Sequence, residues 1–315
     1  MDQKMYVEAE EKLNAALQKD NNFLPALVKM TELLYRNIRY DEALEFARKA
    51  SSIDTHDGAA NYYYGLVNTQ LGNIIDAKDG FDLAALSTEY RSAAYTELSK
   101  LYLKEKDYNK VLIYSAKALD FNRHNLSAYE SQAIAYRNLN DRRKAQQVLN
   151  TMSAFDPLNA FAGFENYLWQ QSEKNKSHFV SLIRSELPHE TYLELAISYF
   201  NTGCIEEAVN VLQLSPSNAM AEYWLAFLQF QQGKDFSLQL EKAIESSPAY
   251  IFPFRSETAG MLLWAIQQND NWKLKYWLAL IYKDRNRRIE SNILFGATKR
   301  YSGLCTFLRR TCNKQ

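Results

Sequence analysis

The sequence is poor in the residues that make turns and cross-links. Of 315 residues, only 10 are glycine, 6 are proline and 3 are cysteine. Because few positions can take up left-handed backbone, the composition favours helices joined by short turns over a β protein with many turns. The cysteines, Cys204, Cys305 and Cys312, are too few for a disulfide framework and show no metal-ligand spacing.

Net charge and long hydrophobic runs are also lacking. Lys plus Arg and Asp plus Glu number 37 each, so we do not expect general binding of nucleic acid. The longest apolar runs, such as residues 276–282, are far shorter than the ~20 residues of a membrane-spanning helix. The first residues lead into a charged amphipathic segment and do not form a secretory signal.

Catalytic motifs are missing as well. The histidines, His56, His124, His178 and His189, fall in predicted loops or at helix ends, without a recognisable orienting partner. The sequence contains no glycine-rich phosphate loop, nucleophile elbow or zinc-protease motif. We therefore predict that the chain is not an enzyme and binds neither a cofactor nor a metal ion.

What the chain does have is a repeat of 34 residues. Small or apolar residues recur in one register at Ala9, Ala43, Ala77, Val111 and Ala145. The positions four and seven residues further on recur in the same way, at Leu13, Ala47, Phe81, Ser115 and Leu149 and at Ala16, Ala50, Ala84, Ala118 and Met152. Five units without an insertion predict one stacked supersecondary unit per repeat.

Residues 125–157 show one unit in full. Tyr129, Ala133 and Tyr136 share one face of a first predicted helix, a second predicted helix follows residues 140–141, and Pro157 ends the unit. Two short helices with small residues where they cross resemble a tetratricopeptide (TPR) repeat. This resemblance implies an all-α fold, a right-handed α-solenoid of TPR-like helical hairpins. It also implies that the small residues Gly65, Ser99 and Ala133 are buried at helix crossings.

The period divides the chain into three predicted parts. Residues 1–158 form the regular array, which begins with residues 5–20 in the register of a lone second helix. We interpret the chain as the C-terminal part of a longer protein, with that helix open to fraying or to pairing with a second copy. Residues 159–249 form degenerate repeats, and residues 250–315 form a last helical repeat and a basic tail.

The last repeat resembles a narrower group. Residues 253–265 (PFRSETAGMLLWA) and the following segment WKLKYWLALIY are similar to the C-terminal TPR region of large bacterial proteins that carry an upstream, carbohydrate-related β domain. In the second helix of this repeat, Ile289, Ile293 and Leu294 are predicted to form the inner stripe. Between residues 283 and 314 there are nine basic and two acidic residues, an excess that is most often a solvated surface.

The first helices of TPR hairpins line the concave face of the solenoid, which predicts the binding residues. The register places on that face Glu32, Tyr35, Tyr62, Leu66, Thr96, Lys100, Glu130 and Arg137. Such a mixture of aromatic, apolar and oppositely charged side chains suits a peptide better than a polyanion. We therefore predict a non-enzymatic scaffold whose partner is a protein segment or an upstream domain of the same chain. The alternative is a helical accessory region of a larger carbohydrate-active enzyme, which contributes glycan contacts or assembly.

Overall fold

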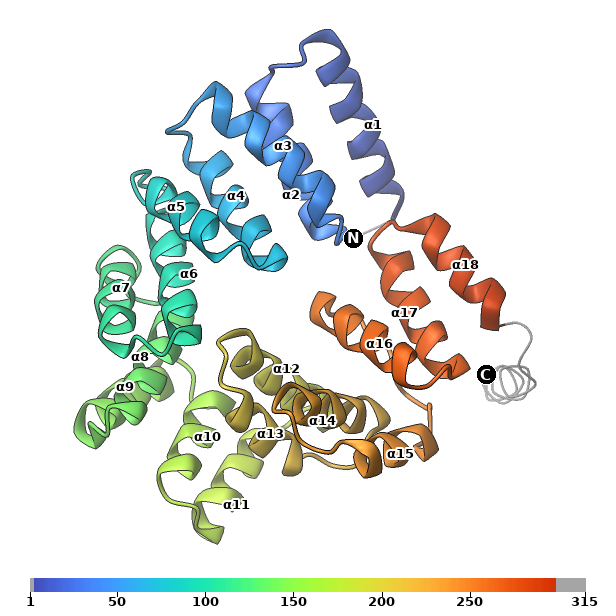
Figure 1. The fold of residues 1–315 in the computed structure, drawn as a ribbon. Coiled ribbons are helices and arrows are strands. Elements are labelled where there is room, and N and C mark those ends of the chain that lie inside the picture. Colours follow the sequence, from blue (N-terminus) through green and yellow to red (C-terminus); the bar gives the residue numbers. More distant parts are fainter. Residues whose placement is uncertain (1–2, 299–315) are drawn as a thin grey trace. The chain divides into compact units, whose positions relative to one another are not determined.

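The computed structural model describes residues 3–298, in which every regular element is a helix (Figure 1). The chain divides into two compact units. The larger unit consists of residues 13–35 and 39–216. The smaller unit consists of residues 217–298 together with residues 3–12 and 36–38.

The helices follow one another with short connections. Up to residue 216 they are α1 (Gln3–Lys19), α2 (Leu24–Arg36), α3 (Tyr40–Ile53), α4 (Gly58–Leu71), α5 (Ile74–Ala84), α6 (Arg91–Lys104), α7 (Tyr108–Phe121), α8 (Leu126–Asn138), α9 (Arg142–Phe155), α10 (Ala160–Trp169), α11 (Glu173–Leu182), α12 (Pro188–Asn201) and α13 (Ile205–Gln213). The remaining helices are α14 (Ala219–Gln231), α15 (Ser237–Glu245), α16 (Ser256–Gln268), α17 (Trp272–Asp284) and α18 (Arg288–Thr298).

Consecutive helices pack as hairpins: α4 on α5, α6 on α7, α8 on α9, α10 on α11 and α12 on α13. In the regular array each second helix also packs on the first helix of the next pair: α3 on α4, α5 on α6, α7 on α8 and α9 on α10. This nearest-neighbour packing is typical of a helical repeat protein. The predicted all-α array of TPR-like hairpins is therefore confirmed, whereas the right-handed superhelix and the three-part division of the chain stay predictions.

The turn inside each hairpin repeats as regularly as the helices. The residue in left-handed backbone is Ile38, Gly72, Lys106 and Asn140 in four successive hairpins, with φ between 58° and 80°. These positions are 34 residues apart, the period of the sequence. Only one of them is a glycine, so the packing of the hairpins imposes this backbone even on Ile38, a β-branched residue that disfavours it.

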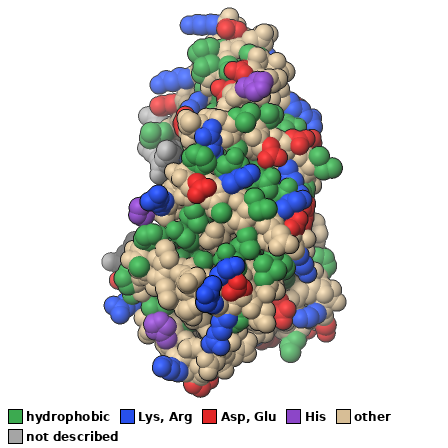
Figure 2. All heavy atoms as spheres, turned by 90° about the vertical axis from the view of Figure 1, so that its left-hand side faces the viewer, with side chains coloured by type: hydrophobic (Ala, Val, Ile, Leu, Met, Phe, Trp, Pro, Cys, Tyr) green, Lys and Arg blue, Asp and Glu red, His purple; other side chains and the backbone are tan. Residues whose placement is uncertain are grey.

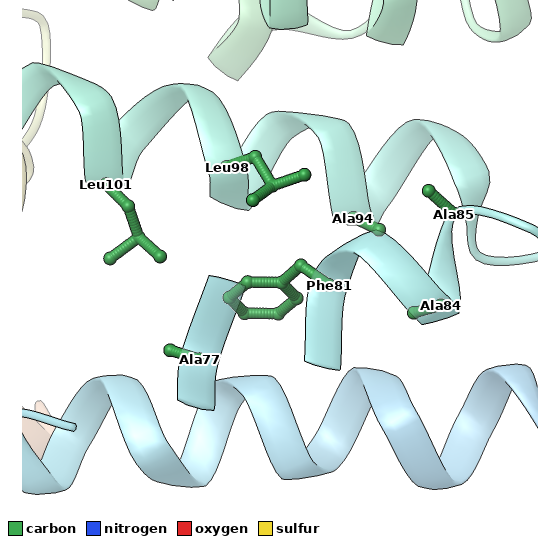
Figure 3. Packing of buried hydrophobic residues seen from close by; sticks show 7 residues of the cluster. All are labelled: Ala77, Phe81, Ala84, Ala85, Ala94, Leu98 and Leu101. Atoms are coloured by element: carbon green, nitrogen blue, oxygen red, sulfur yellow. The ribbon is translucent and has the colours of Figure 1, made fainter. Parts of the chain in front are cut away.

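The core of the second hairpin shows why the inner stripe needs small residues. The ring of Phe81 from α5 lies fully buried against Leu98 and Leu101 of α6 (Figure 3). A Cβ atom added at Gly65 of α4 would lie 2.7 Å from the ring of Phe81. Only glycine therefore fits at this crossing. Gly65, Ser99 and Ala133 are all buried, which confirms the predicted crossing positions.

The N-terminal helix differs from the other second helices. Ala43 and Ala77 are completely buried at the inner position of α3 and α5. The equivalent residue of α1, Ala9, stays partly exposed, as do Leu13 and Ala16, and no described side chain of α1 is buried. The stripe is therefore incompletely covered in the chain as described. Pairing with a second copy through this helix stays a prediction.

The inner stripe predicted for α18 is wrong at Ile289 and Ile293, while Leu294 is partly buried. Ile289 and Ile293 are 75% and 65% exposed, whereas Ser291 and Thr298 are buried. The Ser291 hydroxyl donates a hydrogen bond of 2.9 Å to the Ala279 carbonyl of α17. Because Ser291 is small and its hydroxyl is hydrogen-bonded, α18 can approach α17 closely along the side that carries Ser291. With that side of α18 facing inward, the two isoleucines face outward. Most of the basic tail, with Cys305 and Cys312, lies outside the described residues.

Candidate functional site

The predicted binding residues of α2, α4, α6 and α8 belong to the larger unit. We refer to the side chains that these first helices contribute to one surface as the first-helix face. It consists of Glu32, Tyr35, Tyr62, Leu66, Tyr90, Glu97, Lys100 and Glu130, all partly exposed. Tyr90, which directly precedes α6, and Glu97 were not among the predicted binding residues.

Tyrosines form the first part of this face. The ring centroid of Tyr62 lies 5.3 Å from that of Tyr90 and 5.8 Å from that of buried Phe81. Burial raises the pKa of Tyr62, and the Glu97 carboxylate and the Tyr35 hydroxyl add to the rise. These side chains come from three hairpins, so the tyrosines form a row that crosses α2, α4 and the start of α6.

Two other predicted residues lie beside the tyrosines. Leu66 packs partly on the core around Phe81 while it remains accessible. Glu32 forms an ion pair of 2.9 Å with Lys29, one turn earlier in α2. The face therefore offers an apolar side chain and a charged pair next to the aromatic row.

Thr96 is the predicted residue that the structure buries, with an exposed fraction of 4%. Its hydroxyl donates to the Ser92 carbonyl at 2.8 Å and accepts from the Asn125 amide at 2.8 Å. Because Asn125 also caps α8 by accepting from the Ala128 amide, these bonds fix the start of α8 against α6. The structure places Thr96 beneath the surface, where it supports the face.

Charged residues of α6 and α8 form the second part. Lys100 donates to Glu97 at 2.7 Å. Burial raises the pKa of Glu130 to about 7; the Lys100 ammonium opposes this rise and the Glu194 carboxylate of α12 adds to it. None of the described residues forms a hydrogen bond or ion pair with the Glu130 carboxylate. Glu130 is therefore a partly buried acid, and Lys100, the cation that acts on it, is already paired with Glu97.

Arg137, at the end of α8, is held in a buried network. Its guanidinium donates to Glu165 of α10 at 2.8 Å and to Glu207 of α13 at 2.7 Å. The Tyr199 hydroxyl of α12 donates to Glu165 at 2.8 Å. Burial raises the pKa of Glu165, and the Arg137 guanidinium opposes this rise. The network joins four helices across the irregular repeat, and it occupies the donors that we predicted to face a ligand.

The sequence offered one signal for this network. Glu165 is the lone charged residue of α10, AFAGFENYLW, and such a residue in a buried apolar helix needs a partner. The identity of the partner depends on how the shortened repeat brings α12 and α13 against α8, which the 34-residue period does not describe. Glu207 and Tyr199 therefore emerge only from the structure.

The side of the larger unit formed by the second helices also carries aromatic and charged side chains: Tyr114 of α7 stacks on Tyr102, and Lys78 and Lys110 lie over the Tyr102 ring. Figure 2 shows the side of the molecule on which the second helices α5, α7 and α9 lie. Acidic, basic and hydrophobic side chains are interspersed on it. Isolated exposed apolar residues such as Ile75 and Ile113 are ordinary for a protein surface. The first-helix face is a surface where aromatic side chains of several hairpins adjoin partly buried charges, and the predicted binding residues lie on it.

Two structural features bear on other functions. None of the described helices combines the length and apolarity that a membrane-spanning segment requires. Across residues 3–298, no three His, Cys, Asp or Glu side chains are gathered closely enough to hold a metal ion. The free thiol of Cys204 lies near Glu207, and burial raises its pKa to about 12, so it is a poor nucleophile.

No family model and no curated protein matches the chain. Among solved structures, a tetratricopeptide repeat protein from Parabacteroides merdae is 17% identical, with 88% of this chain and 92% of that chain covered and a TM-score of 0.49. YrrB, described as a TPR protein with an unusual peptide-binding site, is 17% identical, with 71% and 98% covered and a TM-score of 0.44. A human IFIT1 dimer with PPP-AAAA is 15% identical, with 95% and 69% covered and a TM-score of 0.43. At these scores the likeness says nothing about what this chain binds.

Proposed function

We propose that this chain is a non-enzymatic scaffold and that its first-helix face binds an extended segment of a partner protein. The observation that carries the proposal is the row of partly exposed tyrosines that crosses three hairpins beside Leu66 and the Lys100–Glu97 pair. An extended peptide presents side chains at regular intervals and so contacts successive hairpins. Aromatic rings contribute large contact areas with few rotatable bonds.

The charges favour a peptide over a polyanion. Two cations at the face are engaged by carboxylates, Lys100 by Glu97 and Arg137 by Glu165 and Glu207. Lys104 of α6, which lies near Glu97 and Lys100, forms no ion pair with a described residue. A nucleic acid gains affinity from lysines and arginines that neutralise its phosphates. Here a phosphate contact with Lys100 or Arg137 would first require an ion pair to break. Weak binding of a 5′-triphosphate RNA, independent of the face, is the result we expect.

The experiment is a selection of short random peptides on the immobilised chain, followed by hydrogen exchange with an enriched peptide. We expect reduced exchange in α2, α4 and α6 and unchanged exchange in α5 and α9. Protection confined to the second helices, or failure to enrich any peptide, would contradict the proposal.

A glycan is the ligand that the accessory-region alternative requires, and exposed tyrosines can also stack on sugar rings. The partly buried charges of Lys100, Glu97 and Glu130 distinguish the two ligands, because neutral sugars offer no counter-ion for Glu130. Binding of neutral oligosaccharides on an array, lost when Tyr62 is replaced, would favour the alternative.

A further inference from the structure

Glu130 is a partly buried carboxylate that forms no hydrogen bond or ion pair with a described residue. It lies on α8, and the charges of Lys100 on α6 and Glu194 on α12 both act on it. Lys100 is already bonded to Glu97 at 2.7 Å, and Glu194 is exposed. The third neighbouring first helix, α10, contributes Glu165, which Arg137 engages. The arrangement therefore leaves a negative charge that no cation of the described chain neutralises fully.

A partly buried carboxylate is costly unless a positive group lies beside it. Two carboxylates from different helices increase that cost, because like charges repel. A cation supplied from outside removes both penalties. Its position would be at the end of the tyrosine row, since Tyr62 and Lys100 both interact with Glu97.

We propose that the bound segment carries a lysine or arginine that pairs with Glu130 and Glu194, while residues next to it pack on Tyr62 and Leu66. This inference rests on the proposed function and specifies its partner: a peptide with a basic residue beside apolar ones. The basic residue completes the charge balance of α8 and α12, and the tyrosine row fixes the position of the apolar residues. Charge complementarity thus contributes specificity at one position of the peptide.

The test is a double-mutant cycle on an enriched peptide by fluorescence anisotropy. The peptide is compared with a version in which its basic residue is norleucine, against the wild-type chain and Glu130→Gln. We expect the norleucine peptide to bind the wild-type chain about tenfold more weakly, and both peptides to bind Glu130→Gln within about twofold. Glu45→Gln, an exposed carboxylate of α3, is the control and keeps the wild-type difference.

The outcomes separate the two proposals. Enriched peptides without a common basic residue, which are nevertheless displaced by Leu66→Lys, would overturn this inference and leave the proposed function standing. The same holds if Glu130→Gln and Glu45→Gln give equal differences. If no peptide is enriched, the proposed function fails, and this inference fails with it. Circular dichroism of Glu130→Gln verifies that the variant is folded.

Discussion

Gly80 of α5 lies directly against the backbone of α4: a Cβ atom at Gly80 would be 2.9 Å from the Asn61 carbonyl oxygen and 2.9 Å from the Gly65 nitrogen. Two glycines, Gly65 and Gly80, therefore meet at one crossing. Helical glycine is normally unfavourable. Here it is required, because both nearest atoms are backbone and cannot move aside by a rotamer change.

Gly80→Ala should accordingly destabilise the chain by ~1–3 kcal/mol, although alanine is the better helix former. Gly260→Ala is the matched control, since the added Cβ in α16 has no neighbour within 4 Å. That variant should gain ~0.5–1 kcal/mol from helix propensity. Urea denaturation of both variants measures the difference. Equal effects of the two substitutions would contradict the close crossing.

Ile38→Gly should stabilise the chain. Ile38 has φ 58°, in the region that β-branched residues disfavour by ~1–2 kcal/mol. Glycine removes this strain but increases the entropy of the unfolded chain, so we expect a net gain of ~0.5–1 kcal/mol. Asn140, with the same φ, is the control: asparagine tolerates this backbone, and Asn140→Gly should change stability little. A loss of stability in Ile38→Gly would show that its side-chain packing outweighs the backbone strain.

Arg137→Met should cost ~3–5 kcal/mol, because it leaves the Glu165 carboxylate buried without its counter-charge. The Arg137→Met, Glu165→Gln double variant should recover part of that loss, since the remaining amide carries no charge. Lys144→Met is the control: its ion pair with Asp141 is exposed, and we expect a change within about 0.5 kcal/mol. Thermal unfolding of the three variants gives the comparison. A small effect of Arg137→Met would mean that Glu165 is protonated or solvated in the folded chain.

Much of the fold could be predicted because the repeat is strictly periodic up to Pro157. The crossing residue Ala133 and the inner alanines such as Ala43 follow from spacing alone, and the structure buries them. Gly80 was not singled out, because only the geometry of the α4–α5 crossing shows how closely the backbones approach. On α18 the register pointed to Ile289, but a hydrogen-bonded serine took the inner position.

The candidate site could be predicted only in part. Helical spacing singled out Tyr62 and Glu130, which lie at partly exposed positions of first helices, and their contact with a ligand stays a prediction. It did not reveal that Thr96 is buried or that Arg137 is bonded to acids 28 and 70 residues away. Such partners depend on the shortened repeat between α9 and α12. The 34-residue period predicts the contacts that all regular repeats have in common. It cannot predict the partners of Arg137, because they lie in the part of the chain where the period is interrupted.

Glu130 should make stability depend on pH. Its pKa in the folded chain, about 7, lies above the ordinary value of 4.5. The folded state therefore binds the proton more tightly, and the stability that this provides, complete below pH 4.5, is lost as the pH rises to about 7. Glu130→Gln should lose this dependence. The free energy of unfolding of Glu130→Gln minus that of the wild type should therefore be ~1–2 kcal/mol larger at pH 8 than at pH 4. Lys100 and Glu194, the charged neighbours from α6 and α12, are unchanged in both proteins.

Urea unfolding at several pH values gives this difference directly. Glu165, whose pKa burial also raises, is present in both proteins and so cancels in the comparison. Parallel stability curves for the wild type and Glu130→Gln would contradict the partly buried, unpaired state of Glu130.

The most direct test of the peptide-binding face is the affinity of an enriched peptide for Leu66→Lys and Ile113→Lys. Both variants place a lysine on a helix of the larger unit, Leu66 on the first-helix face and Ile113 exposed on α7. Fluorescence anisotropy should show at least a tenfold loss of affinity for Leu66→Lys, which corresponds to about 1.4 kcal/mol, and no change for Ile113→Lys. Circular dichroism establishes that both are folded. Equal affinity of the two folded variants, or a loss only in Ile113→Lys, would contradict binding at the first-helix face.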